Sequence, residues 1–345
     1  MVKVSFIVAI YNVGCYLPQC IESMVNQGMK NVEIILINDG STDDCLDICE
    51  SYAARDDRIK VINQENGGAN AARNAGLQIA RGEWVYFVDG DDFIDRAACT
   101  AIEKYLDMAY DIVMFSHARF INGQVKQVPY SEMKLEFHGK DFEELQLSAL
   151  NRLGKYRYNF NVLDAATLCN KMYRRSFLLA NKLSFIPNFP KLQDMTFNLM
   201  VYDYADSAVY IPHVGYYYQY NDQSVSHRYQ NNMIEKFDVI NAWFADFCVD
   251  KKEDDRFIKA YRERIATHMR TCIVRYLCNR KNERPYRERK AEYLRLRGSE
   301  PYGSALDQTI IGAFCGYKER VLAFAVKYRL FWLCELLCIL YEKVK

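Results

Sequence analysis

The first 115 residues alternate between short apolar runs and runs in which apolar residues recur every three or four positions. The apolar runs, typical of strands, cover residues 3–11, 32–39, 59–64, 83–89 and 111–116. The runs with helical spacing lie between them, at residues 16–27, 45–55, 70–80 and 96–107. Residues 32–39 (VEIILIND) are almost continuously apolar, as expected of a strand that is covered on both faces. The alternation predicts an α/β fold built from βαβ units, with a mostly parallel sheet flanked by helices.

The pattern changes after residue 116. Residues 117–230 are rich in tyrosine and less regular, and they predict sheet-edge strands, loops and one helix near 193–204. The remainder of the chain shows helical spacing throughout. We therefore expect a first domain over residues 1–230, with halves 1–115 and 116–230, followed by a helical C-terminal extension over residues 231–345.

The composition indicates the cellular compartment and argues against some kinds of cysteine site. Half of the 345 residues are apolar, which is enough for a substantial core. None of the 12 cysteines forms a Cys-x-x-Cys pair, so zinc-ribbon and thioredoxin-type sites are not indicated. The N-terminal segment lacks a cleavage-site pattern, and no uncharged apolar run reaches the roughly 18 residues needed to span a membrane. We expect a cytoplasmic protein in a reducing compartment.

The net charge of +1 conceals an uneven distribution of charge. Residues 1–115 contain 18 Asp and Glu against 9 Lys and Arg, whereas residues 251–297 contain 16 Lys and Arg against 7 Asp and Glu. The acidic part would need cations wherever it met a phosphorylated ligand. The basic part fits either a solvated helix face or a surface for anionic lipid, an anionic acceptor or nucleic acid.

Polar side chains follow four of the predicted strands, where ligands bind in parallel α/β sheets. These residues are Tyr11, Asp39, Asn66, Gly67, Arg73, Asp89 and Asp91. An aromatic ring can stack on a base and a carboxylate can accept from a base N–H. A glycine turn permits close approach, and an acid pair can hold a divalent cation against phosphates. The arrangement predicts a nucleotide site.

Each of these features also has a simpler interpretation. Tyr11 could be an ordinary strand-end aromatic, and Ser41 or Thr42 could cap a helix. Asn-Gly-Gly is a common turn, and the acid cluster FVDGDDFID (87–95) could be a solvated loop. The succession of one polar signal after each strand favours the nucleotide site.

Four segments together resemble a family 2 glycosyltransferase with the GT-A fold, of the inverting, bacterial polysaccharide-biosynthesis type. They are VSFIVAIYNVGCYLPQCIESMVNQ, VEIILINDGSTDD, NGGANAARNAGLQIARGEWVYFVDGDDFID and NKMYRRSFL. The resemblance is dense over residues 3–115 and continues thinly to about residue 230. It implies that residues 1–115 bind the nucleotide and residues 116–230 face the acceptor.

The resemblance also implies roles for individual residues. Asp39 would contact the base, Ala9 and Tyr11 would flank it, and Asn66, Gly67 and Arg73 would lie near the nucleotide. Asp89 would face the ribose, and Asp91 or Asp92 would bind Mn²⁺ or Mg²⁺ on the diphosphate. The extra Asp92 leaves open which of these two acids is the metal ligand.

The general base of the family maps to Asp194, in KLQDMTFN (191–198), where Gln193 replaces the usual Glu. The alternative is that Asp194 only caps the helix that follows. The segment 216–228 resembles the flexible loop of the family, whose His227 and Arg228 could reach the donor diphosphate when the loop closes. The alternative is a solvent loop beside a Tyr-rich strand.

The implied activity transfers a sugar, with inversion, from a nucleotide sugar to a hydroxyl of a saccharide or lipid-linked saccharide acceptor. UDP is the commonest nucleotide in the family, and surface or capsular polysaccharide is the expected product. The basic, amphipathic segment 317–345 could contact the inner face of the cytoplasmic membrane, form a lid, or make a homo-oligomer contact. No nucleic-acid partner is expected.

Other classes fit the sequence less well. A haloacid-dehalogenase-type phosphatase places its Asp-x-Asp after the first strand, with Thr or Val where Phe93 stands. A nucleotidyltransferase would need a basic glycine-rich loop after that strand, and a dinucleotide oxidoreductase would need G-x-G-x-x-G there. Both motifs and a P-loop are absent. A non-catalytic nucleotide-sugar-binding or scaffold protein stays an alternative, weakened by the presence of every expected acid.

Overall fold

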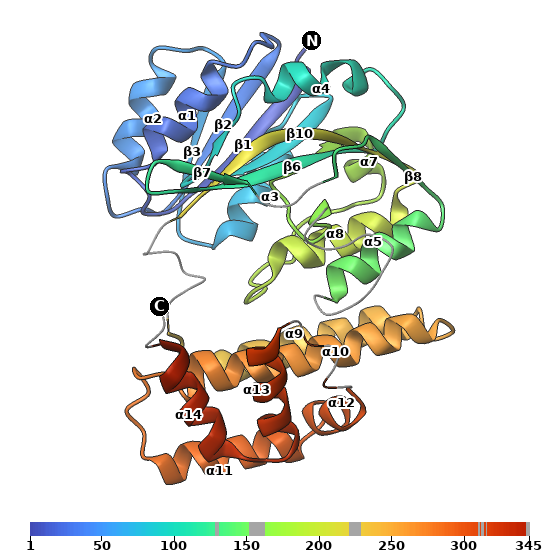
Figure 1. Ribbon diagram of the computed structural model, residues 1–345. Helices are drawn as coiled ribbons and strands as arrows, with labels where there is room; N and C mark the ends of the chain where they lie inside the picture. The colour runs from blue at the N-terminus through green and yellow to red at the C-terminus, as the bar shows by residue number, and fades with distance from the viewer. Residues whose placement is uncertain are drawn as a thin grey trace. The chain divides into compact units, whose positions relative to one another are not determined.

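The computed structural model describes residues 1–127, 131–151, 163–220, 229–309, 311, 314 and 316–342. The chain divides into two compact units (Figure 1). The first comprises residues 1–149 and 157–221, and the second comprises residues 150–156 and 222–345.

The first unit is built on one sheet with the strand order β3-β2-β1-β4-β9-β6-β10-β5, to which β7 adds on β6 and β8 on β10. The strands are β1 (Val4–Ile10), β2 (Val32–Asp39), β3 (Ile59–Gln64), β4 (Trp84–Asp89), β5 (Phe93–Ile94), β6 (Ile112–Ile121), β7 (Gln124–Gln127), β8 (Leu135–His138), β9 (Lys171–Arg174) and β10 (Ser207–Gln219). The pairs β1–β2, β2–β3, β1–β4 and β6–β10 are parallel, and the other pairs are antiparallel.

The helices of the first unit connect and cover these strands (Figure 1). They are α1 (Leu17–Val25), α2 (Cys45–Ala53), α3 (Ala69–Ile79), α4 (Ala98–Leu106), α5 (Asp141–Leu150, whose last residue belongs to the second unit), α7 (Arg175–Ala180) and α8 (Gln193–Tyr204). The predicted α/β fold with a central sheet, flanking helices and C-terminal helices is confirmed.

Side chains alternate between the two faces of the parallel strands, as the period of a strand requires. On β1, Phe6 and Val8 belong to the core that also contains Leu17 of α1. Ile7 points to the other face, towards α3, where a Cβ at Gly76 would lie 2.4 Å from Ile7 Cγ2. Glycine at position 76 therefore allows α3 to lie close against the sheet, and this fixes the position of the polar residues that α3 carries.

The sheet is less uniformly parallel than the sequence pattern suggests. The short strand β9 lies in its interior, antiparallel to both β4 and β6. The 13-residue strand β10 runs along β6, although the sequence predicts only edge strands in this region. The sequence of β9, KMYR, is too short and too polar to predict a buried strand. Its Lys171 is nevertheless fully buried.

The second unit is helical, as predicted for this part of the chain. Its helices are α9 (Met233–Val249), α10 (Asp255–Cys272, followed by a π-helical turn at Ile273–Leu277), α11 (Tyr286–Gly298), α12 (Tyr302–Gln308), α13 (Tyr317–Lys327) and α14 (Phe331–Glu342). The last amphipathic run is divided in two because Arg329 adopts a left-handed conformation with φ 59°.

Several basic side chains of residues 251–297 are held in ion pairs within the second unit. Arg270 lies 2.6 Å from Glu319, Arg289 lies 2.5 Å from Glu335, and Arg284 pairs with Glu292. Two of these pairs join different helices and the third joins the segment before α11 to that helix, so they support a structural use of part of this positive charge. None of the helices in the described part of the chain combines the length and apolar character needed to cross a bilayer.

Candidate active site

The carboxyl ends of the parallel strands bring the predicted nucleotide-site residues to one edge of the sheet. Asp39, the last residue of β2, lies opposite Gln64, the last residue of β3. On the other side of β1, Ala9 lies opposite Asp89, the last residue of β4. The register of the sheet therefore places the second, third and fourth strand ends around the end of β1.

Asp39 is 2% exposed and organises the turn that precedes α3. Its carboxylate accepts hydrogen bonds from Gln64 Nε2 at 2.7 Å and from the backbone N–H groups of Gly67 and Gly68 at 2.9 and 2.8 Å. The side chain of Asn66 donates to the Asp39 carbonyl at 2.9 Å. These three hydrogen bonds leave one of the roughly four acceptor positions of the Asp39 carboxylate unused.

The loop after β1 is tied to the loop after β2 through Asn12, a residue that the sequence analysis did not single out. The Asn12 N–H donates to Ser41 Oγ at 3.1 Å, and its Oδ1 accepts from the Thr42 N–H at 2.8 Å. Ser41 and Thr42 therefore join two loops and do not cap α2, whose N-cap is Asp44. The neighbouring Tyr11 is 48% exposed, so its ring is available to a ligand.

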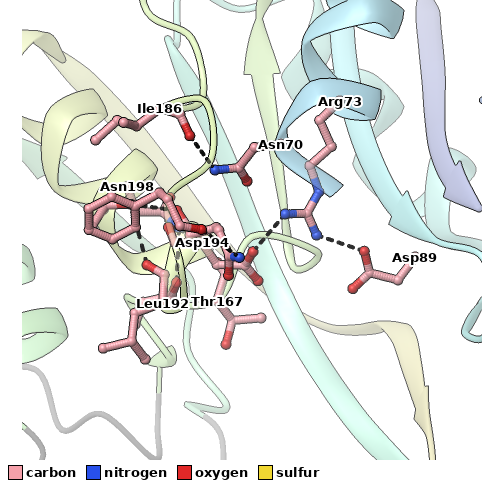
Figure 2. A network of polar contacts seen from close by, with 12 residues as sticks. Asn70, Arg73, Asp89, Thr167, Ile186, Leu192, Asp194 and Asn198 are labelled. Carbon is pink, nitrogen blue, oxygen red and sulfur yellow. Dashed lines mark hydrogen bonds and ion pairs between the residues drawn. The ribbon is translucent and has the colours of Figure 1, made fainter. Parts of the chain in front are cut away.

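Arg73 joins the two halves of the first unit. Its guanidinium donates to Asp89 at 2.7 Å through Nη2 and to Asp194 at 3.1 Å through Nη1 (Figure 2). The Arg73 side chain is only 6% exposed, whereas those of Asp89 and Asp194 are 34% and 36% exposed. A buried cation thus holds two carboxylates that both remain accessible, one at the predicted donor site and the other the predicted base.

Burial and charge oppose each other in this network. Burial alone would lower the pKa of Arg73, but the charges of Asp194 and Asp89 outweigh it and hold that pKa above its usual range. Burial raises the pKa of Asp194, and the charge of Asp89 adds to this effect, while Arg73, the Leu168 N–H and Lys171 lower it. The net result is a raised pKa for Asp194, which suits a general base, because efficient bases have a pKa near the working pH.

Asp194 lies in the first turn of α8 and does not cap the helix. The N-cap is Leu192, which adopts a left-handed conformation and has no capping side-chain hydrogen bond. Asn198, one turn further along α8, donates to the carbonyls of Asp194, Ala166 and Thr167 at 2.9, 3.1 and 3.2 Å (Figure 2). These bonds fix the start of α8 against the preceding loop and leave the Asp194 carboxylate free to meet Arg73.

A buried lysine, Lys171, holds the loop that precedes it, residues 164–170. Lys171 Nζ donates to the Asp164 carbonyl at 3.1 Å, to Asn170 Oδ1 at 2.8 Å and to the Thr167 carbonyl. Burial lowers the pKa of Lys171 to about 8, although nearby Asp164 opposes the shift. Three oxygen acceptors match the three hydrogens of an ammonium group, so Lys171 fixes the loop that carries the Leu168 N–H beside Asp194.

The acid cluster after β4 separates into different roles. Asp92 is 1% exposed, and its carboxylate accepts from Tyr216 Oη at 2.6 Å and from the Gln219 N–H at 2.8 Å. Burial, together with the charges of Asp91 and Asp89, raises the pKa of Asp92 well above its usual range. Asp92 therefore attaches the β4–β5 turn to β10, and this geometry favours Asp91 over Asp92 as the metal ligand.

The half-buried acids of the cluster fit a divalent cation that is completed by substrate, but they do not form a metal site of three protein ligands. Within the described ranges, no group of three or more His, Cys, Asp or Glu side chains is arranged to hold a metal ion. Mg²⁺ usually takes one or two carboxylates and completes its coordination with substrate phosphates and water. The half-buried Asp89 and Asp91 fit such a site. His227 and Arg228 lie outside the described residues.

Comparison with known proteins decides the family. The sequence profile of glycosyl transferase family 2 matches residues 5–180, half of the chain. The chain belongs to glycosyl transferase family 2. Its relatives include EpsH of Bacillus subtilis (strain 168), a glycosyltransferase by name, which is 33% identical over 273 residues that cover 79% of this chain and 76% of EpsH.

This family 2 member is also similar to a second named transferase in sequence and to a solved structure in fold. The poly(ribitol-phosphate) beta-glucosyltransferase of Bacillus spizizenii is 28% identical over 220 residues, which cover 63% of this chain and 32% of that protein. The crystal structure of S. aureus TarS 1-349 in complex with UDP-GlcNAc matches with a TM-score of 0.65 at 20% identity, covering 99% of this chain and 92% of that chain. At this identity the TarS match concerns the fold, and it confirms the predicted GT-A architecture.

The family match in this glycosyltransferase does not extend to the predicted base. Residues 5–180 include Asp39, Arg73 and Asp89 but not Asp194. Asp194 is connected to the matched part by its ion pair with Arg73, across 121 residues of sequence. Tyr216 was expected to begin the flexible loop 216–228, but it lies within β10 and donates to Asp92.

Proposed function

We propose that this family 2 glycosyltransferase transfers a sugar from a UDP-sugar to a hydroxyl group of a saccharide or lipid-linked saccharide, with inversion at the anomeric carbon. The observation that carries the proposal is the position of Arg73 between Asp89 and Asp194. Asp89 belongs to the acid cluster where a donor diphosphate would be held, and Asp194 is the accessible carboxylate on the acceptor side. A transferase needs both the group that holds the donor diphosphate and the base that accepts the acceptor proton close to the reacting atoms.

A UDP-sugar is the favoured donor because two kinds of observation support it. Asp39 keeps acceptor capacity beside a glycine turn and the exposed Tyr11, as a uracil site requires. The TarS structure, which shares the fold over 99% of this chain, was determined with UDP-GlcNAc. The donor proposed here is therefore a UDP-hexose or UDP-N-acetylhexosamine.

The proposed reaction is a single displacement. Asp194 accepts the proton of the acceptor hydroxyl while the hydroxyl oxygen attacks the anomeric carbon. The new glycosidic C–O bond forms on the face opposite to the breaking bond between the anomeric carbon and the diphosphate oxygen, and UDP leaves with that electron pair. General-base help of this kind contributes roughly 10²–10⁴-fold.

Asp91, with Asp89 beside it, would hold Mn²⁺ or Mg²⁺. Such an ion supplies Lewis-acid stabilisation of the leaving diphosphate. Arg73 contributes a fixed positive charge between the donor acids and the base, in a position where water has little access. A guanidinium group binds phosphate oxygens as well as carboxylates.

The acceptor is proposed to be a hydroxyl-bearing glycan of the bacterial cell envelope. This part of the proposal is supported by the relatives, since one is a glucosyltransferase named for poly(ribitol-phosphate). The exposed apolar side chains on α13, on α14 and in the turn between them support a contact with the membrane surface, where lipid-linked acceptors reside. Phe324 is 44% exposed, Tyr328 57% and Trp332 57%.

A thermal-shift screen tests the proposal. The full chain is melted with UDP-, GDP- and dTDP-sugars, each with and without Mn²⁺, and nucleotide-sugar hydrolysis is then measured for any donor that raises the melting temperature. We expect a UDP-sugar to raise it in a Mn²⁺-dependent manner and to be hydrolysed slowly without an acceptor. No shift with any nucleotide sugar would contradict the proposal.

A further inference from the structure

The hydroxyl group of Tyr216 joins the two ends of the turn that follows β4. The backbone N–H of Asp89 donates to Tyr216 Oη at 3.3 Å, and the hydroxyl in turn donates to Asp92 Oδ2 at 2.6 Å. Tyr216 is fully buried in β10, 127 residues after Asp89 in the sequence. One hydroxyl group therefore accepts from the first residue of the turn and donates to the last.

The strand pairing explains why a side chain is needed at this point. β9 pairs with β4 from Trp84 to Tyr86, so Asp89 lies three residues beyond this pairing. A backbone N–H that is shielded from water needs a hydrogen-bond acceptor. At Asp89 the acceptor is a hydroxyl group from β10, so Tyr216 connects the end of β4 to β10 where the backbone pairing with β9 has ended.

Backbone contacts fix the other side of the turn. The Asp92 N–H donates to the Asp89 carbonyl at 3.0 Å, which closes a β-turn over Gly90 and Asp91. The Gly90 N–H donates to the Ala9 carbonyl at 3.1 Å. A Cβ at Gly90 would lie 3.1 Å from that same carbonyl oxygen, so glycine allows the turn to lie close to β1. The end of β1 therefore holds one side of the turn, and β10 holds the other.

The position of Asp91 depends on this turn. Asp91 is the third of its four residues, and its half-buried side chain is the favoured ligand for the divalent cation of the donor. The direction of this side chain follows from the conformation of the turn, which Tyr216 holds at both ends. Burial raises the pKa of Tyr216 well above its usual range, so the hydroxyl keeps its proton and stays a donor to Asp92.

We propose that Tyr216 is a positioning residue for the donor site, whose hydroxyl fixes the turn 89–92 in the conformation in which Asp91 holds a divalent cation against the donor diphosphate. The inference rests on the proposed transferase function and adds to the donor site a residue from the half 116–230. Because Tyr216 is fully buried, it acts through Asp89 and Asp92. Removing a group that orients a metal ligand typically weakens metal binding about 10–100-fold.

The test compares two tyrosines of β10 whose hydroxyl groups hold different parts of the first unit. Tyr216→Phe removes the bridge between Asp89 and Asp92 and keeps the ring. Tyr210→Phe is the matched control, because Tyr210 is also buried in β10 and its hydroxyl donates to the Ser131 carbonyl at 3.1 Å. The Mn²⁺ affinity of the full chain is measured by electron paramagnetic resonance in the presence of UDP. Amide hydrogen exchange in the turn is measured in the metal-free protein.

We expect Tyr216→Phe to weaken the Mn²⁺ affinity about tenfold and to speed exchange of the Asp89 N–H about tenfold or more. Tyr210→Phe should change neither quantity more than about twofold. Asp92→Ala should lose the same affinity as Tyr216→Phe, and the double variant should lose no more than either, because the two side chains act as one unit. Asp92→Asn keeps an oxygen that accepts from the Tyr216 hydroxyl, so it should bind Mn²⁺ nearly normally.

Three results would overturn the inference. They are wild-type Mn²⁺ affinity in Tyr216→Phe, an equal loss of affinity in Tyr210→Phe, and additive losses in the Tyr216→Phe/Asp92→Ala double variant. A wild type that binds no Mn²⁺ in the presence of UDP would contradict the proposed transferase function itself, and the inference with it.

Discussion

The guanidinium of Arg73 lies 3.1 Å from the carboxylate of Asp194, and its other terminal nitrogen lies 2.7 Å from Asp89. One buried cation therefore couples the predicted base to the acids of the donor site. This coupling has a consequence for acid–base behaviour, because the positive charge favours the ionised form of Asp194, and only that form accepts a proton from the acceptor.

Replacing Arg73 should move the acidic limb of the pH–rate profile. The groups facing Asp194 are Arg73, Lys171, Asp89 and the Leu168 N–H. Without the Arg73 charge the pKa of Asp194 rises, so kcat at saturating donor should fall at a higher pH. An opposite charge within about 4–6 Å typically contributes 1–3 pKa units, so the limb of Arg73→Gln should shift upwards by about that amount.

Arg73→Lys is the matched variant, because it keeps the charge and loses only the fork of donors. Its acidic limb should lie close to that of the wild type. An unchanged limb in Arg73→Gln, with the variant folded and saturated with donor, would show that Arg73 does not set the protonation of the base.

The two acids Asp91 and Asp92 should respond differently to substitution by asparagine. Asp91→Asn should weaken the apparent Mn²⁺ affinity, measured from the metal dependence of donor hydrolysis, by about tenfold or more. Asp92→Asn should leave that affinity nearly unchanged. It should lower the free energy of unfolding by about 1–3 kcal/mol, because it disturbs the buried bonds to Tyr216 and Gln219. The reverse pattern would identify Asp92 as the metal ligand.

Glu33 should make the stability of the first unit dependent on acidic pH. It lies buried in β2 and accepts from Lys60 Nζ at 2.7 Å, Ser5 Oγ at 2.6 Å and the Arg81 N–H at 2.6 Å. Burial alone would raise its pKa, but these hydrogen bonds lower it from 4.5 to about 2. A lowered pKa in the folded state contributes stability above pH 4.5 that is lost as the pH falls towards 2.

The size of this contribution is about 3 kcal/mol, since each pKa unit corresponds to about 1.4 kcal/mol. Urea unfolding of Glu33→Gln at pH 7 should show a loss of that order, and the difference from the wild type should shrink near pH 2.5. Glu103→Gln, at an exposed position on α4, is the control. Equal stability of the wild type and Glu33→Gln at pH 7 would contradict this assignment.

The exposed apolar residues of α13 and α14 should contribute to membrane binding. Trp332 and Leu336 are 57% and 44% exposed and one turn apart on α14, so their replacement by serine should not disturb the fold. Sedimentation with phosphatidylglycerol vesicles should fall for Trp332→Ser/Leu336→Ser and persist for Val249→Ser, which alters an equally exposed residue of α9. Sedimentation unchanged by deletion of residues 317–345 would exclude this contact.

Several elements could be predicted from the sequence because their signals are local. The strand Val32–Asp39 follows from one continuous apolar run, and the expected helix near residues 193–204 corresponds to Gln193–Tyr204. The strand-end residues Asp39 and Asp89 were recognisable because parallel strands end at one edge. The sequence could therefore indicate the fold class and the place of the site.

The remaining features depend on contacts between distant residues. Nothing near Asp92 indicates that Tyr216, 124 residues away, binds it, so burial of this acid was not predictable. The interior strand Lys171–Arg174 is too short and too polar for its pattern to be read. The break at Arg329 depends on one left-handed residue within a continuous amphipathic run.

The most direct test of the account is the rate of sugar transfer by Asp194→Asn, compared with Asp206→Asn at an exposed position just beyond α8. If Asp194 is the base that its ion pair with Arg73 suggests, transfer should fall about 10²–10⁴-fold while UDP-sugar affinity stays within a few-fold of the wild type. Asp206→Asn should transfer normally. An Asp194→Asn variant that transfers sugar at the wild-type rate would contradict the central claim.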